Sequence, residues 1–126
     1  MDIYSNEGTF ETPTITFDLN AGFLEIKGRS IPENPIEFYH PLFTALDNYE
    51  KMGKPATEVI IKLEYYNSSS SKCILDLLKK LENIHEGGNQ VTINWYYEEE
   101  DENMLLAGED YQVIINLPFT MIKIAD

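Results

Sequence analysis

Polar and hydrophobic residues alternate along the first part of the chain in the way that a half-buried β-strand requires. "TITFDL" (14–19) and "FLEIKG" (23–28) are two such runs, rich in β-branched and aromatic residues. Asn20-Ala21-Gly22 separates them, and asparagine and glycine both tolerate the positive φ of a short loop. The pattern therefore predicts an opening β-hairpin.

A helical spacing follows the segment "SIPENP". Apolar residues recur three and four positions apart between residues 38 and 49, which predicts an amphipathic helix. Pro41 falls inside this run, so the helix either starts near Pro41 or bends there. Gly53 and Pro55 end it. The β-branched run "TEVIIKLEY" (57–65) then predicts a strand that is covered on both faces.

The clearest helical stripe lies between residues 74 and 84 and ends at two glycines. "QVTINWYY" (90–97) predicts a further strand, and the acidic run 98–102 favours the start of a short third helix. "PFTMIKI" (118–124) predicts the last strand. The order β-β-α-β-α-β-α-β predicts an α/β sandwich, in which a mixed sheet packs against about three helices.

Composition narrows the choice of partners. The chain has 126 residues, 43% of them hydrophobic, which is enough for a single domain spanning 1–126 with its own core. Twenty-two acidic residues against nine basic ones give a formal net charge of -13. Because this charge repels phosphate backbones and anionic lipid surfaces, we expect neither a nucleic acid nor a membrane as partner.

Cys73 is the only cysteine, so neither an intramolecular disulfide nor a thiolate zinc cluster is expected. The first twenty residues lack the basic and apolar regions of a secretory leader, and no apolar run approaches the roughly 20 residues of a membrane span. These features predict a cytoplasmic protein. Cys73 itself, at the edge of the helical stripe, is expected to be a small buried side chain.

Motifs for catalysis, phosphate binding or metal binding are not found in the sequence. His40 and His85 lack a second histidine or cysteine at ligand spacing, so a surface or helix-terminal position is the simpler interpretation. The acidic run 98–102 lacks the pattern of a calcium loop. We expect no catalytic residue, no metal and no cofactor.

Aromatic residues leave a second interpretation open. Trp95 and Tyr97 share one face of the predicted strand, and with Tyr65 and Tyr66 they could line a cleft for a small molecule. Packing against the helices is the more common fate of such side chains. A small-molecule-binding domain therefore remains an alternative.

Four consecutive serines, 68–71, join the predicted strand to the helical stripe. One serine, or Asn67 before them, is enough to cap a helix by accepting a backbone N–H. The functional alternative is that one hydroxyl accepts a phosphoryl group, whose charge the N-terminus of a helix can hold without unfolding. If the serines only cap, the chain is a constitutive interaction domain.

Several stretches, in order along nearly the full chain, resemble the SiaC-type bacterial regulatory phosphoproteins, which are related in fold to the STAS, or anti-sigma-factor-antagonist, domains. The matching stretches are "TPTITFD", "IPENP", "LEYYNSSSSK", the helix ending in "HEGG", "VTINWYY", "EDENMLLAGEDY" and the final "PF". The resemblance implies a single STAS-like domain.

The resemblance also implies a non-enzymatic partner-switching protein in signal transduction. Members of the family are substrates of a dedicated Ser/Thr kinase and a PP2C-like phosphatase, and their unphosphorylated form binds and activates an output protein. In the best understood arrangement this output protein is a diguanylate cyclase, which couples the switch to c-di-GMP signalling and biofilm formation.

The phosphate acceptor of the family follows an asparagine, in an Asn-Thr-Ser-Ser pattern that begins a helix. Asn67 matches this asparagine, so Ser68 falls on the acceptor, with serine in place of threonine. The Asp-Ser-Ser-Gly turn of the more distant STAS antagonists also indicates Ser68. Because Ser71 extends the run, Ser69 stays an alternative. The expected partner surface around the acceptor consists of Tyr65, Tyr66, Asn67, Ser69 and Lys72.

Overall fold

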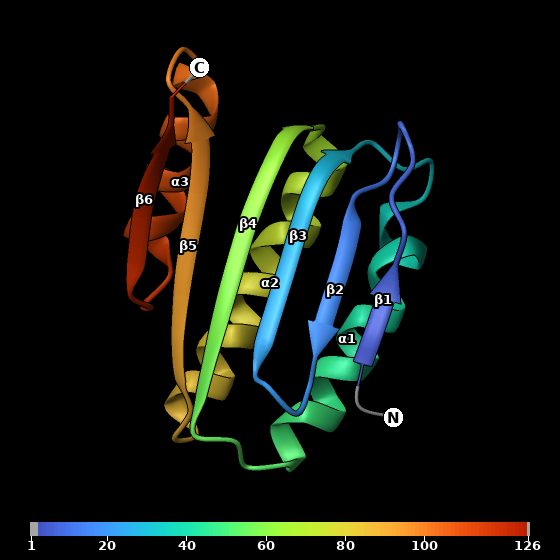
Figure 1. The fold of residues 1–126 in the computed structure, drawn as a ribbon, viewed down its shortest axis with the longest axis vertical. Coiled ribbons are helices and arrows are strands. Elements are labelled where there is room, and N and C mark those ends of the chain that lie inside the picture. Colours follow the sequence, from blue (N-terminus) through green and yellow to red (C-terminus); the bar gives the residue numbers. More distant parts are fainter. Residues whose placement is uncertain (1–2, 126) are drawn as a thin grey trace.

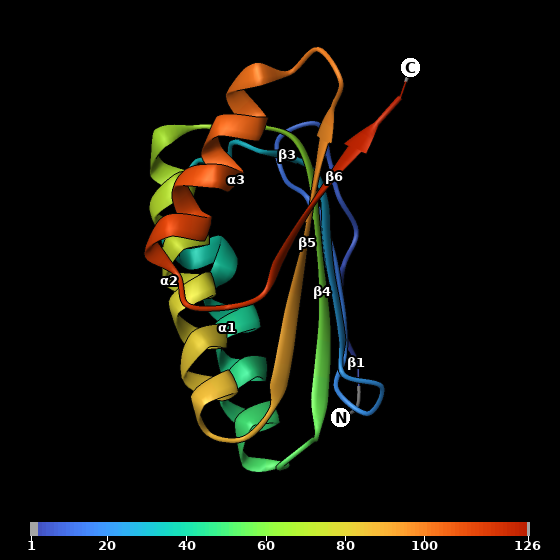
Figure 2. The ribbon, with the colours of Figure 1, turned by 90° about the vertical axis from the view of Figure 1, so that its left-hand side faces the viewer.

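Six strands form one sheet, and three helices cover one of its faces (Figures 1 and 2). The computed structural model describes residues 3–125. In chain order, the elements are β1 (Ile3–Asn6), β2 (Thr14–Asp18), β3 (Phe23–Ser30), α1 (Pro35–Lys51), β4 (Ala56–Tyr66), α2 (Ser68–Glu86), β5 (Gln90–Glu98), α3 (Glu102–Ile114) and β6 (Phe119–Ile124).

The strands follow one another across the sheet in sequence order (Figure 1). β1, β2 and β3 are antiparallel, whereas the pairs from β3 to β6 are parallel. A parallel pair needs a crossover connection, and α1, α2 and α3 each provide one. All three helices lie on the same side of the sheet, so within residues 3–125 no helix covers the opposite face (Figure 2). The predicted mixed sheet with three helices is confirmed.

The predicted hairpin is the β2–β3 pair, in which Ile15 faces Ile26 and Phe17 faces Leu24. Of its loop residues, only Gly22 takes a positive φ, of 69°. The hairpin does not form the edge of the sheet, because β1 pairs with β2 and precedes it. The sequence pattern did not predict this edge strand, which has four residues and too little alternation to be recognised.

Strand β4 is covered on one face only, so the prediction of cover on both faces is wrong. Val59, Ile61 and Leu63 point toward the helices and are buried, whereas Glu58 and Lys62 are exposed on the other face. The apolar run in the sequence is continuous because a half-buried isoleucine, residue 60, occupies the open face between these two charged residues.

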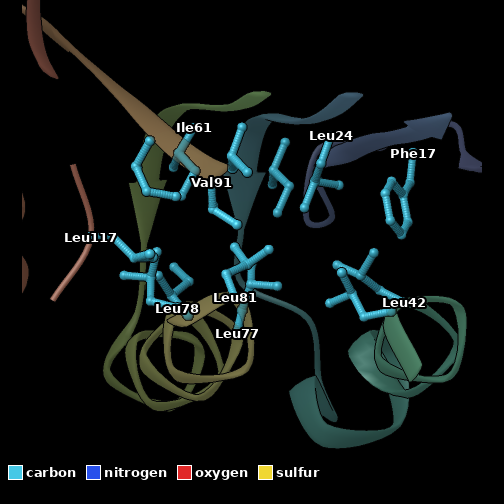
Figure 3. Packing of buried hydrophobic residues seen from close by; sticks show 14 of the residues in the cluster. Phe17, Leu24, Leu42, Ile61, Leu77, Leu78, Leu81, Val91 and Leu117 are labelled. Atoms are coloured by element: carbon cyan, nitrogen blue, oxygen red, sulfur yellow. The ribbon is translucent and has the colours of Figure 1, made fainter. Parts of the chain in front are cut away.

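Helix α2 supplies the middle of the core, as its apolar stripe predicted. Leu77, Leu78 and Leu81 are buried beneath the sheet, where Figure 3 shows them facing Ile61 and Val91. The stripe therefore fixes which side of α2 is buried. Because only Asn67 separates β4 from α2, the first turn of α2 lies at the end of the sheet where β4 finishes.

Helix α1 runs through Pro41 and begins well before it, so the alternative that the helix starts near Pro41 is wrong. Asn34 caps this helix by accepting a hydrogen bond from the backbone N–H of Glu37, 3.2 Å away. Pro35 occupies the first turn, where a missing N–H costs little. Among the described residues, the helices are all too short or too polar to span a bilayer.

Candidate functional site

Helix α2 begins directly after strand β4, and Asn67 is its cap. The Asn67 Oδ1 atom accepts a hydrogen bond of 2.9 Å from the backbone N–H of Ser70, and the Asn67 carbonyl accepts one of 3.0 Å from Ser71. Of the two capping residues that the sequence allowed, the asparagine is the one used. Capping therefore leaves the serine hydroxyls free for other contacts.

Ser70 is part of the core. Its side chain is fully buried, and its Oγ accepts a hydrogen bond of 2.9 Å from Ser30 Oγ on strand β3. Ser30 Oγ also lies 2.6 Å from the hydroxyl of Tyr39 on helix α1. The Ser30 carbonyl accepts a hydrogen bond from the backbone N–H of Asn67. These bonds tie the start of α2 to β3 and to α1.

Tyr39 is the buried last member of the hydrogen-bonded series Ser70, Ser30 and Tyr39. Burial raises the pKa of Tyr39 to about 12, because a phenolate there would lose its water, and the hydrogen bond to Ser30 only partly offsets this effect. At neutral pH the phenol is therefore protonated and available to the Ser30–Ser70 pair.

Tyr39 is expected to lower the stability of the protein as the pH rises from about 10 to about 12. The folded state holds the proton more tightly than the unfolded chain, so its contribution is complete below about pH 10 and is lost toward pH 12. The difference between the two pKa values corresponds to about 3 kcal/mol. Urea denaturation of the native protein and of Tyr39→Phe should show a steeper alkaline loss for the native protein, and identical pH profiles would contradict this role.

Ser71 also makes contacts within the fold. Its Oγ donates a hydrogen bond of 2.7 Å to the carbonyl of Ser68, one turn earlier. Its own carbonyl accepts a hydrogen bond of 3.1 Å from the hydroxyl of Tyr111 on helix α3. Ser71 therefore connects the start of α2 to α3, as Ser70 connects it to α1 and β3.

Ser68 and Ser69 are different, because both side chains are exposed at the tip of the helix. Their backbone N–H groups belong to the first turn, which has no acceptor within the helix. An anion attached to either hydroxyl would therefore lie beside unpaired donors and the positive end of the helix dipole. The geometry suits both residues equally.

The residues expected to form the partner surface differ in accessibility. Tyr65 is half-exposed, and Ser69 and Lys72 are exposed. Tyr66 and Asn67 are partly buried; Tyr66 packs against the core, and burial raises the pKa of its hydroxyl. Three of the five residues are thus presented outward, and the other two hold the loop in place.

A β-bulge at Glu64 directly precedes the two neighbouring tyrosines. Gly28 pairs with Leu63 and Arg29 pairs with Tyr65, so Glu64 has no partner on β3. The extra residue reverses the alternation of β4 at its end. Tyr65 therefore lies on the same face of the sheet as Arg29, and the Arg29 guanidinium is 5.6 Å from the centroid of the Tyr65 ring. The next residue, Tyr66, points toward the helices and packs against the core.

The four aromatic residues do not line a common cleft. Trp95 is fully buried, and its Nε1 donates a hydrogen bond of 3.0 Å to the carbonyl of Met104 in α3. Its ring meets that of Tyr111 edge to face, at a centroid distance of 5.6 Å. Tyr97 packs against the same core, whereas Tyr65 is exposed. Packing against the helices, the more common fate, is what the structure shows for Trp95.

The other histidine, cysteine and acidic residues considered in the sequence analysis are explained by the fold. His85 lies in the last turn of α2, and its Nδ1 accepts a hydrogen bond of 3.1 Å from the backbone N–H of Val91. His40 is exposed on α1, and Cys73 is buried, as expected. In the acidic run, Asp101 caps α3. Across residues 3–125, no group of three or more histidine, cysteine or acidic side chains is arranged to hold a metal ion.

Comparison with known proteins shows the family of the chain. The model of the SiaC family regulatory phosphoproteins matches residues 6–124. The chain belongs to this family. An uncharacterized protein of Pseudomonas aeruginosa (strain UCBPP-PA14) is 32% identical over 114 residues, which cover 90% of both chains.

Two solved structures of SiaC from Pseudomonas aeruginosa share the fold of this SiaC-family chain. The crystal structure of apo-SiaC matches with a TM-score of 0.88 and 31% identity, over 97% of this chain and 99% of that one. SiaC also matches in the crystal structure of the diguanylate cyclase SiaD in complex with its activator SiaC, with a TM-score of 0.90, 30% identity and coverage of 96% and 99%.

Sequence reasoning missed two residues of the site in this SiaC-family chain. Ser30 and Tyr39 decide that Ser70 is buried, yet they lie 40 and 31 positions before it along the chain. A serine at the end of the second hairpin strand, directly before "IPENP", was the only available signal. Nothing in that signal distinguishes a buried hydroxyl from an exposed one.

Proposed function

We propose that this SiaC-family chain is a non-enzymatic, cytoplasmic partner-switching protein that is reversibly phosphorylated on Ser68, with Ser69 as the alternative acceptor. A Ser/Thr kinase and a PP2C-like phosphatase set its state, and the unphosphorylated form binds an output protein. The observation that carries this proposal is the unequal use of the four serines. The hydroxyls of Ser70 and Ser71 make hydrogen bonds within the fold, whereas Ser68 and Ser69 are exposed.

The charges at the three helix starts also support the proposal. Helices α1 and α3 each carry an acidic residue in the first turn, Glu37 and Glu102, which suits the positive end of the dipole. The first turn of α2 carries none, although the chain has 22 acidic residues. A phosphate of about -1.5 to -2 charge on Ser68 would supply the missing negative charge without disturbing the helix.

We propose a diguanylate cyclase as the output protein. The support is the SiaC of Pseudomonas aeruginosa, which is described as the activator of the diguanylate cyclase SiaD and was crystallised in complex with it. On this chain, Tyr65, Ser69 and Lys72 would contact the output protein from around Ser68. A phosphate at the centre of this surface would weaken binding by repulsion and by the cost of removing its water.

Mass spectrometry of the protein isolated from its own cells tests the modification. The peptide spanning Asn67 to Lys72 should gain one phosphate that phosphatase treatment removes, and fragmentation should assign it to Ser68 or Ser69. Phosphate on Ser70 or Ser71 would contradict the proposed geometry. A peptide that stays unmodified under all growth conditions would favour the constitutive interaction domain.

Binding measurements test the switch. Calorimetric titration with the diguanylate cyclase of the same organism should give native-like affinity for Ser68→Ala and at least a tenfold loss, about 1.4 kcal/mol, for Ser68→Asp. Ser71→Asp serves as the matched control, because its side chain lies in the same turn but outside the proposed acceptor pair. Equal affinities of Ser68→Ala and Ser68→Asp would show that the serine does not control binding.

A further inference from the structure

A cavity of about 590 Å³ opens on the face of the sheet that no helix covers. It lies over β3, β4 and β5 and extends to the loop before α3, where Asp101 forms part of its wall. Its volume falls within the range of small-molecule sites in proteins, roughly 300–1,000 Å³. None of the four serines lines this cavity.

Two lysines lie side by side in this cavity. Lys27 and Lys62 are register partners on the adjacent parallel strands β3 and β4, so their side chains project side by side from the open face. Like charges placed directly opposite one another destabilise a sheet. The only ion pair that involves either lysine within residues 3–125 joins Lys27 to Glu25 at 3.9 Å, and the Lys62 Nζ lies 5.6 Å from the ring centroid of Tyr96.

Arg29 brings a third positive charge, so three of the nine basic residues line one cavity. Its guanidinium is held against two rings, 4.5 Å from the centroid of Phe10 and 5.6 Å from that of Tyr65. Its Nε is buried and has no hydrogen-bond partner within residues 3–125. A buried donor is normally paired, and the edge of a guanidinium matches the oxygens of a phosphate.

The other residues that line the cavity disfavour a small inorganic anion as the ligand. Tyr96 and Tyr97 add aromatic surface, while Glu64 and Glu98 are exposed carboxylates. These carboxylates repel an inorganic polyanion and accept hydrogen bonds from hydroxyl or amino groups. The suitable ligand combines a phosphate for the basic residues, a planar ring for the tyrosines and N–H or O–H donors for the carboxylates.

We propose that this cavity binds a nucleotide, with its phosphates between Lys27, Lys62 and Arg29 and its base against Tyr96. The like-charged lysine pair is then neutralised by the ligand, and the guanidinium of Arg29 adds a third positive charge to the phosphate site. All the lining residues belong to the isolated chain, so the site can be tested without phosphorylation and without an output protein.

Isothermal titration of the purified, unphosphorylated chain with ADP and GDP tests the site. We expect saturable binding that weakens at high salt, with at least tenfold weaker binding of adenosine and guanosine. Lys62→Gln and Lys27→Gln should each weaken nucleotide binding at least tenfold. Lys79→Gln, an exposed lysine on α2, is the matched control and should bind as the native protein does.

Three results would overturn the proposal. Absence of saturable binding of either nucleotide at millimolar concentration would show that the cavity is not a nucleotide site. Unchanged binding in both Lys27→Gln and Lys62→Gln would place the nucleotide elsewhere. Pyrophosphate that binds as tightly as ADP would rule out a site for the nucleotide class. The melting temperature of each variant shows that it is folded.

Discussion

Aspartate in place of Ser70 is expected to destabilise the protein by about 3–5 kcal/mol. The Ser70 side chain is fully buried, and its Oγ accepts a hydrogen bond from Ser30. A carboxylate there would be removed from water without a positive partner, next to the Tyr39 hydroxyl that completes the chain of hydrogen bonds. Aspartate in place of Ser69, one position earlier, stays in water and is expected to stabilise the helix start by about 0.3–1 kcal/mol.

Urea denaturation of Ser69→Asp, Ser70→Asp and Ser70→Ala measures the difference. Ser70→Ala should cost only about 1 kcal/mol, because Ser30 and Tyr39 keep their hydrogen bond to each other. Similar midpoints for the two aspartate variants would show that the site tolerates a charge at Ser70. If Ser70→Asp is much less stable than Ser69→Asp, as expected, the folded protein tolerates a negative charge only on the exposed serines, Ser68 and Ser69.

Valine in place of Gly108 is expected to destabilise the protein by about 3 kcal/mol. Gly108 lies in α3, where an added Cβ would come within 2.6 Å of the Trp95 ring and of the Met121 side chain. Trp95 cannot yield easily, because it is fully buried and its Nε1 is bonded to the Met104 carbonyl. A larger side chain would therefore push α3 away from β5 and β6.

Gln112→Val is the matched control for Gly108→Val. Gln112 lies one turn later on the same helix and is exposed, so valine there changes helix propensity by only a few tenths of a kcal/mol. Thermal unfolding followed by circular dichroism should show a much lower midpoint for Gly108→Val than for Gln112→Val. Equal midpoints would show that α3 can be displaced from Trp95 without cost.

The candidate site could be predicted only in part. Asparagine before a run of serines indicated where α2 begins, and Asn67 does cap it. The accessibility of each serine could not be predicted, because it depends on residues from other elements. Ser70 is buried because Ser30 of β3 and Tyr39 of α1 meet it. The basic cavity was missed for the same reason, since the pairing of Lys27 with Lys62 is a matter of strand register.

The sequence by itself determined the features that depend on neighbours along the chain. The apolar stripe of α2, the β2–β3 hairpin and the acidic start of α3 could all be predicted, because periodicity and capping act over a few residues. Only the tertiary structure decided which face of β4 is covered and where its bulge falls. Both follow from the helices lying on one side of the sheet and from the register between distant strands, which no local pattern specifies.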